Sequence, residues 1–193
     1  MKDSIYLVLD MENDLVHADG PNGKAAYGEQ VRGRRIIENT AEALRKARAA
    51  GLYIGFVRVG FSPDYRECPP ESPIFSGARK NGIFKLGTWG TEVHPDLGMQ
   101  PGDFDIVKHR VSPFYSTSLE AILRAKGIRR IYCSGISTNA VVQATVRDGH
   151  DRDYEMVVLE DCCCALSAEE HAQSIAGIQR FCRLTSSQDV VFE

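Results

Sequence analysis

The chain has 193 residues, 43% of them hydrophobic and 25% charged, which is typical of a single water-soluble globular domain. A net charge of −3 gives no electrostatic basis for binding nucleic acid, and the short basic run at 32–35 predicts only a solvated helix face. The apolar run at 5–9 is too short for a signal peptide or a membrane span, so we expect a cytoplasmic protein with no membrane partner.

Six short apolar runs, rich in β-branched and aromatic residues, predict six strands. They cover residues 5–9, 52–57, 104–107, 130–133, 155–159 and 190–192. Because most of these runs are continuously apolar rather than alternating, they favour strands that are buried on both faces, as in a parallel sheet.

Helical patterns separate the predicted strands. The main helices are expected at residues 36–47, 118–124, 138–148 and 167–182. Gly51 and Gly127 follow the first two as C-terminal stops. The third helix is expected to begin at Thr138 or Asn139, and the fourth at Ser167, because these side chains cap helix N-termini well.

The alternation of strands and helices predicts one α/β domain over residues 1–193. Its sheet is expected to be doubly wound, mainly parallel and six-stranded, with helices on both faces. The stretch 61–103 holds most of the prolines and shows little periodicity. A loop of this length is either a functional lid or binding loop, or a packed surface excursion.

Three polar features follow three of the predicted strands. Asp10 ends the first strand, Lys108 ends the third, and Gly135 begins the turn after the fourth. Open α/β sheets bind ligands outside the carboxyl ends of their strands, so these features are expected to converge at one edge. Burial raises a carboxyl pKa and a nearby ammonium lowers it, so Asp10 beside Lys108 is either a poised acid–base group or a static ion pair. Their joint placement favours a functional pair.

The segment 135–145 is predicted to be a tight glycine turn followed by a helix N-terminus. Backbone N–H groups presented there suit an oxyanion or a ligand carboxylate. The alternative is an ordinary strand-to-helix connection in which Gly135 only permits the bend.

Three segments carry a resemblance to a known family: LVLDM at 7–11, VKHRVSPF at 107–114 and GISTNAVVQAT at 135–145. On these segments the chain resembles the isochorismatase-like hydrolases, and the match extends over nearly its whole length. Many amidase members of that family use an aspartate, a lysine and a cysteine. The resemblance therefore implies a hydrolase acting on a small organic substrate.

The resemblance also implies roles for particular residues. Asp10 takes the place of the family's proton donor or acceptor, and Lys108 takes the place of its lysine. A non-proline cis peptide bond is implied within the turn at Ile136–Ser137. The backbone amides of Ala140 and Val141 are implied to form the oxyanion site.

Val141 stands where the family's amidase members have their nucleophilic cysteine. A valine side chain has no proton to lose and no lone pair to donate, so a covalent thioester cannot form there. Isochorismatases also lack this cysteine and hydrolyse a vinyl ether, which needs only an acid and an attacking water. They carry a tyrosine where Ser137 stands, so we do not expect specific cleavage of isochorismate.

Other cysteines and metal ions are weak alternatives. Cys133 is predicted to be a small buried hydrophobe, whereas the run 162–164 follows the fifth strand, where one thiol near the site is a minor alternative. The cysteines have no C-x-x-C spacing, and neighbouring cysteines pair poorly, so a reduced protein is expected. Nicotinamidase-like members bind metal through an Asp/His cluster after the second strand, which residues 56–59 lack. We expect neither a metal nor a cofactor.

The remaining candidates for substrate binding are aromatic or polar side chains near these motifs: Trp89, Arg110, Phe114, Tyr115 and Asn139. Ligand cavities are mostly apolar with a few polar anchors, so Arg110 or Arg58 is the expected partner of a substrate carboxylate. Core packing is the better interpretation of Phe114.

Two functions are compatible with these features. The first is a cofactor-free hydrolase of a small amide, urea or enol ether, with Asp10 and Lys108 catalytic and no covalent intermediate. The second is a degenerate or cysteine-substituted family member that binds a small ligand without turnover. A nucleotide-binding domain is a third class, but neither G-x-G-x-x-G nor G-x-x-x-x-G-K-[ST] is present. The resemblance further implies a homo-oligomer, either a dimer or a tetramer.

Overall fold

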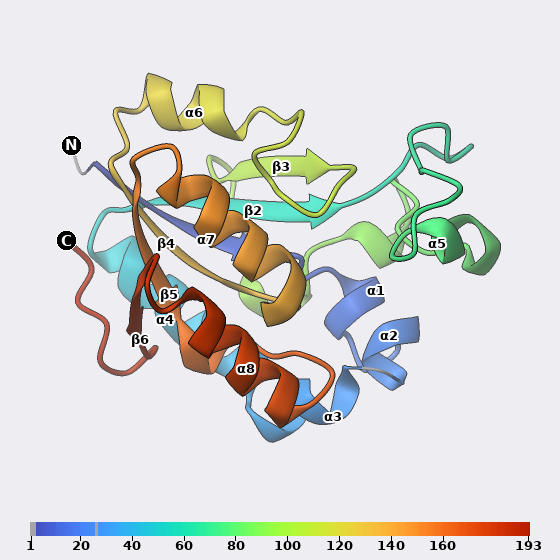
Figure 1. The fold of residues 1–193 in the computed structure, drawn as a ribbon, viewed down its shortest axis with the longest axis horizontal. Helices are drawn as coiled ribbons and strands as arrows, with labels where there is room; N and C mark the ends of the chain where they lie inside the picture. The colour runs from blue at the N-terminus through green and yellow to red at the C-terminus, as the bar shows by residue number, and fades with distance from the viewer. Residues whose placement is uncertain (1–2, 26) are drawn as a thin grey trace.

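The structure is a computed structural model, and it describes residues 3–25 and 27–193. Within these residues, six strands form one sheet in the order β3-β2-β1-β4-β5-β6 (Figure 1). The strands are β1 (Ser4–Leu9), β2 (Tyr53–Val59), β3 (Phe104–Lys108), β4 (Arg130–Gly135), β5 (Glu155–Leu159) and β6 (Arg183–Thr185). All neighbouring strands are parallel, which confirms the predicted doubly wound sheet.

Helices cover both faces of the sheet because its central strand is apolar on both sides. Tyr6 and Val8 of β1 pack in one core cluster with α4 (Ile36–Ala49). Leu7 and Leu9 point to the opposite face. There they pack with α6 (Leu119–Ala125), α7 (Gln143–His150) and α8 (Ala168–Ile178). Figure 1 shows these three helices on one face of the sheet. The alternation of side chains along a strand therefore builds two cores from one apolar run.

The predicted helix boundaries hold at some ends and fail at others. Gly51 and Gly127 have positive φ values and follow α4 and α6, as predicted. Ser167 caps α8 by accepting a hydrogen bond from the backbone N–H of Glu170. The third helix begins differently, because extended Ser137 precedes a π-helical turn, η3 (Thr138–Val142), that leads into α7.

The last predicted strand is wrong. Residues 190–192 are not a strand, and the sixth strand is β6, which pairs with β5. The side chains of Val190 and Phe192 are buried although this segment is not a strand. The Phe192 ring packs against Tyr132, with the two ring centroids 4.8 Å apart. The edge strand β6 is short, polar and partly exposed, so no apolar run marks it in the sequence.

Short helices surround the carboxyl edge of the sheet. After β1 come α1 (Asn13–Val16), α2 (Pro21–Lys24) and α3 (Gly28–Gly33). The long connection 61–103 contains α5 (Ser76–Asn81) and the 3-10 turns η1 (Trp89–Thr91) and η2 (Pro95–Leu97), and β5 is followed by η4 (Glu160–Cys162). Among the described residues, no helix has the length and apolar character needed to cross a membrane.

Candidate active site

Asp10 and Lys108 meet at the carboxyl edge of the sheet. Asp10 directly follows β1, and its backbone N–H donates to the carbonyl oxygen of Val57 (2.8 Å), which fixes it against β2. Lys108 is the last residue of β3, and its Nζ lies 2.8 Å from Oδ2 of Asp10. The side chains are only 2% exposed for Lys108 and 7% for Asp10, so two segments far apart in the chain fold to bury one ion pair.

The two oxygens of Asp10 have different surroundings. Oδ2 faces the Lys108 ammonium, which also donates to the carbonyl oxygen of Arg110 (3.0 Å). Oδ1 is buried and has no hydrogen-bond partner within residues 3–25 and 27–193. Burial raises the pKa of Asp10, and the ammonium of Lys108 offsets part of this rise. The pair therefore presents one anchored oxygen and one unsatisfied acceptor.

Glu12 is a second buried carboxyl group, which sequence reasoning missed. Its Oε2 accepts a hydrogen bond from the Val59 N–H (3.2 Å), and its Oε1 lacks a partner in the described part of the chain. Burial raises the pKa of Glu12 well above its usual range, and the nearby Asp10 carboxylate raises it further. Its position shortly after a buried strand was the available signal.

The glycine turn packs directly against the end of β1. A Cβ atom at Gly135 would lie 2.3 Å from the carbonyl oxygen of Leu9, so only glycine allows this approach. The Ile136–Ser137 peptide bond that follows is cis. The turn therefore lies beside Asp10, which itself follows Leu9 in the chain.

The predicted oxyanion donors are only partly available. The backbone N–H of Ala140 already donates to the carbonyl oxygen of Ser137 (3.2 Å), and that of Val142 reaches the same oxygen (3.3 Å). The π-helical turn thus uses the Ala140 amide internally. Ala140 is consequently not a free donor toward a ligand in this conformation.

Val141, which the resemblance places at the position of the family's cysteine, lies in the wall of the cavity. Its side chain is 1% exposed and packs in the core cluster on the α7 side of the sheet. Together with Asp10, Lys108 and Ser137, it lines one open cavity of about 170 Å³. The three sequence segments are therefore brought together around a single space.

Further lining residues come from segments in which the sequence did not identify these side chains as part of the site. The long connection 61–103 contributes four apolar side chains, Ile74, Phe75, Ile83 and Phe84. The first short helices and the residues beside them contribute Leu15, Asn22 and Tyr27. Burial raises the pKa of the Tyr27 hydroxyl, which is hydrogen-bonded to Ser137. The long connection therefore forms part of the cavity wall, and its role as a functional lid or binding loop stays a prediction.

The five predicted substrate-binding residues do not line this cavity: Trp89, Arg110, Phe114, Tyr115 and Asn139. The guanidinium of Arg110 donates to the carbonyl oxygens of Glu67 (3.0 Å) and His109 (2.6 Å), so it stabilises a loop. Phe114 stacks on Tyr154 in the core, as its alternative interpretation stated.

The side chains of Trp89, Tyr115 and Asn139 lie outside the cavity and are exposed to solvent. Trp89 is 45% exposed and packs edge-on against the ring of His17, while Tyr115 and Asn139 are solvent-exposed. Arg58, the alternative anchor for a carboxylate, forms an ion pair with Asp105 on the neighbouring strand (2.6 Å).

The buried cysteines are poor substitutes for the missing nucleophile. Cys133, Cys162, Cys163 and Cys164 are fully buried, and none of them lines the cavity. Burial raises the pKa of every one of these thiols, that of Cys164 to about 12. A thiolate is therefore disfavoured at neutral pH. Within the described residues, no group of three or more His, Cys, Asp or Glu side chains is placed to hold a metal ion.

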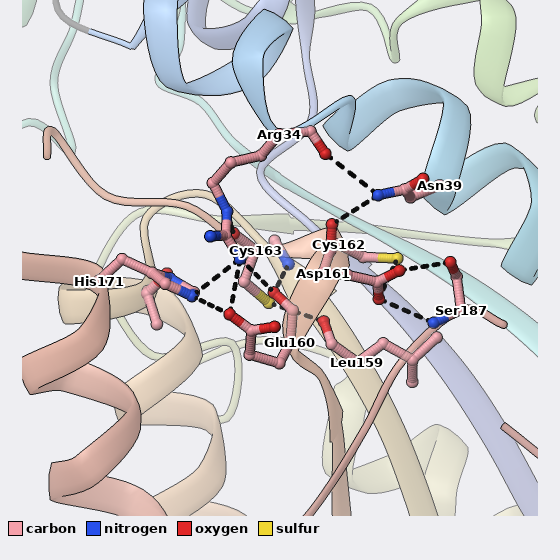
Figure 2. Close-up of polar contacts among 11 residues, drawn as sticks. Arg34, Asn39, Leu159, Glu160, Asp161, Cys162, Cys163, His171 and Ser187 are labelled. Atoms are coloured by element: carbon pink, nitrogen blue, oxygen red, sulfur yellow. Dashed lines mark hydrogen bonds and ion pairs between the residues drawn. The ribbon is translucent and has the colours of Figure 1, made fainter. Parts of the chain in front are cut away.

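A second polar cluster contacts the first residue of η3, which directly follows the glycine turn. Figure 2 shows Arg34, Glu160 and His171 pointing toward one another. Arg34 Nη2 lies 2.6 Å from Glu160 Oε1, and His171 Nε2 lies 2.5 Å from the same oxygen. On its other side, Nδ1 of His171 contacts the hydroxyl of Thr138 (2.8 Å), the first residue of η3. Sequence reasoning missed this cluster, because its members lie up to 137 residues apart.

Known proteins resemble this chain in both sequence and structure. A family model described as the isochorismatase domain matches residues 4–189. The ureidoacrylate amidohydrolase RutB of a Methylorubrum extorquens strain is 36% identical over 170 residues, which cover 82% of this chain and 68% of that protein.

Solved structures share the fold at lower sequence identity. A cysteine hydrolase from Pseudomonas syringae pv. phaseolicola superposes with a TM-score of 0.85 at 22% identity, covering 98% of this chain and 92% of that one. An N-carbamoylsarcosine amidase from Thermoplasma acidophilum gives a TM-score of 0.78 at 24% identity, with both chains fully covered. With the matched family model and the sequence relative, these likenesses show that the chain belongs to the isochorismatase-like hydrolase family.

Proposed function

We propose that this protein hydrolyses a small amide, urea or enol ether by acid–base chemistry, without a covalent enzyme intermediate. The observation that carries the proposal is the unpartnered Oδ1 of Asp10, which is buried on the wall of the cavity while Lys108 holds Oδ2. A buried acceptor without a partner is costly, so it indicates a place where a substrate or a water molecule is bound. The 36% identical ureidoacrylate amidohydrolase supports the amide and urea classes.

The chemistry assigns separate tasks to the two charged groups. For an amide or urea, Asp10 accepts a proton from an attacking water, and the resulting tetrahedral adduct collapses as that proton passes to the leaving nitrogen. For an enol ether, protonated Asp10 donates its proton to carbon, and water attacks the oxocarbenium carbon while returning a proton to the Asp10 carboxylate. The hemiketal then collapses to a carbonyl as the C–O bond to the leaving alcohol breaks and the hemiketal hydroxyl proton is transferred to the leaving oxygen. In both cases Lys108 orients the carboxyl group and balances its charge. Val141 closes the wall beside the reacting carbon and takes no part in bond formation.

The test is a turnover screen of small amides, ureas and enol ethers with purified protein, including an Asp10→Asn variant. Loss of a general acid–base group is expected to lower the rate of hydrolysis by about 100- to 10,000-fold. Asp151→Asn is a matched control, because Asp151 is exposed. A variant Asp10→Asn that retains the wild-type rate would show that the proposed mechanism is wrong.

The second candidate is binding without turnover, and it is favoured by two observations at the turn. Val141 carries no reactive atom, and the Ala140 amide is already used within the turn. Val141→Cys separates the candidates, since it restores a thiol at the position of the family nucleophile. Amidase activity that appears only in Val141→Cys, in a protein whose wild type binds but does not turn over the same amide, supports the second candidate.

A further inference from the structure

Ten of the fifteen described residues that line the cavity are apolar, and the charged ones form a single ion pair. Its two charged lining residues within the described chain are Asp10 and Lys108, which already neutralise each other at 2.8 Å. The other polar lining side chains, Asn22, Tyr27 and Ser137, are uncharged. A ligand entering the cavity therefore meets hydrogen-bonding groups and carbon, but no unpaired positive charge on a described residue.

Three cationic side chains of the motifs near the cavity already have partners. Lys108 is buried between Asp10 and the carbonyl oxygen of Arg110. Arg110 itself donates to two backbone carbonyl groups, and Arg58 pairs with Asp105. Binding a carboxylate to any of these three groups would require breaking its present contact, because a charge transferred into an apolar site needs a partner.

Acidic groups further oppose an anionic ligand. Glu12 is fully buried close enough to Asp10 for their charges to interact, and Asp14 is buried with an oxygen 2.7 Å from the backbone nitrogen of Phe84 in the cavity wall. Glu12 and Asp14 therefore contact the backbone N–H groups of two lining residues, Val59 and Phe84. A ligand carboxylate would bring a further acidic group to this part of the wall, where no described lining residue offers an unpaired positive charge.

We propose that the cavity selects an uncharged amide or urea carrying a compact apolar group, and that it rejects substrates carrying a carboxylate. The identity of the reacting group rests on the proposed function, whereas the selectivity for neutral ligands is a matter of binding alone. The cavity volume of about 170 Å³ limits the size of the apolar group on the substrate, because an apolar cavity of about 150 Å³ accommodates benzene. A branched alkyl chain or a single aromatic ring is thus the expected substituent.

Pairs of ligands with matched shape test the selectivity. Binding of isobutyramide is compared with isobutyrate, and benzamide with benzoate, by calorimetry on the full chain. The neutral member of each pair is expected to bind about 100-fold more tightly, because its partner must bury an unpaired charge. Equal or tighter binding of the carboxylates overturns the proposal, and so does the absence of binding by all neutral probes at about 10 mM.

A positive charge introduced into the cavity wall tests whether the preference for neutral ligands over carboxylates can be reversed. Ile74 lines the cavity and is 56% exposed, so Ile74→Lys places an ammonium at the site without burying it. This variant is expected to narrow or reverse the preference for the neutral ligands. Leu166→Lys is the matched control, since Leu166 is similarly exposed but outside the cavity, and the preference should be unchanged.

The outcomes also separate this inference from the proposed function. Neutral ligands that bind tightly but are never hydrolysed would contradict the proposed hydrolase and leave the selectivity intact. Hydrolysis restricted to carboxylate substrates, with loss of the rate in Asp10→Asn, would contradict the selectivity and leave the hydrolase intact.

Discussion

The Asp10–Lys108 pair and the Arg34–Glu160–His171 cluster are two ionic groups at the same edge of the sheet, and they differ in how well their atoms are satisfied. In the cluster, Arg34 donates to Glu160 and to the carbonyl oxygen of Cys163, and both ring nitrogens of His171 have contacts. In the pair, Oδ1 of Asp10 is buried without a partner in the described residues. Satisfied polar networks hold a fold in place, whereas the proposed function depends on the unmet acceptor beside the cavity.

Exposure separates the two groups as well. The side chains of Arg34 and Glu160 are 27% and 37% exposed, against 2% and 7% for Lys108 and Asp10. Solvent screens the charges of Arg34 and Glu160, whereas the third member, His171, is buried. The pair has no such compensation, and its charges depend on each other.

Removing the Lys108 charge is expected to have the largest effect. Lys108→Met would leave Asp10 buried without a counter-charge, so the free energy of unfolding should fall by about 3–5 kcal/mol. Urea unfolding measures the change, with exposed Lys80→Met as the control. In the double variant with Asp10→Asn, much of the loss should be recovered. Additive losses in the double variant would show that the two charges do not depend on each other.

His171 tests the cluster. His171→Leu removes one partner from Thr138 and one from Glu160, so the free energy of unfolding is expected to fall by about 1–3 kcal/mol. Because this cluster supports the start of η3, ligand affinity should also fall, while the pH dependence of any turnover should keep its shape. A shifted pH–rate profile would instead place His171 among the reacting groups.

The contribution of His171 to the free energy of unfolding is also expected to depend on pH, in a direction set by its pKa. Burial lowers the pKa of His171 below its ordinary value of 6.5, although the Glu160 carboxylate opposes this and Arg34 adds to it. The unfolded chain then binds a proton more readily than the folded chain does. Stability from this residue is therefore present above pH 6.5 and is lost as the pH falls through the folded pKa. His171→Leu should lack this loss.

The sequence predicted the pair because each member ends a strand with an apolar pattern. Once Asp10 and Lys108 are placed at the ends of parallel strands, the geometry of the sheet brings them to one edge. The other predicted strands, except the last, were correct for the same reason. The edge strand β6 was missed because it is polar, and residues 190–192 were misassigned because they are apolar for packing outside the sheet.

The cavity wall was not predictable in this way. Ile74 and Phe84 come from a connection without periodicity, and nothing local indicates which of its apolar side chains turns toward Asp10. Arg110 and Trp89 were expected at the site because they lie near its motifs, but proximity in sequence does not set the direction of a side chain. Arg110 satisfies loop carbonyl groups instead.

Glu12→Gln tests whether a buried carboxyl group without a full set of partners behaves differently from one in the Arg34–Glu160–His171 cluster. Of the variants proposed, it is expected to have the smallest effect on stability. Burial and the Asp10 carboxylate raise the pKa of Glu12 above its ordinary value of 4.5, while Lys108, the Val59 N–H and Arg58 oppose the rise. The folded protein therefore binds this proton more tightly than the unfolded chain does. Glu12 then costs stability as the pH rises from 4.5 through the folded pKa.

A neutral glutamine keeps the shape of the side chain and removes this pH-dependent cost. Glu12→Gln is expected to raise the free energy of unfolding by about 1 kcal/mol at alkaline pH, with a smaller gain under acidic conditions. Urea unfolding across a pH series measures this, with exposed Glu71→Gln as the control. A loss of stability that is equal at every pH would mean that the carboxyl oxygen of Glu12 is as well satisfied as those in the Arg34–Glu160–His171 cluster. The unpartnered oxygens at this edge would then no longer distinguish the site from its support.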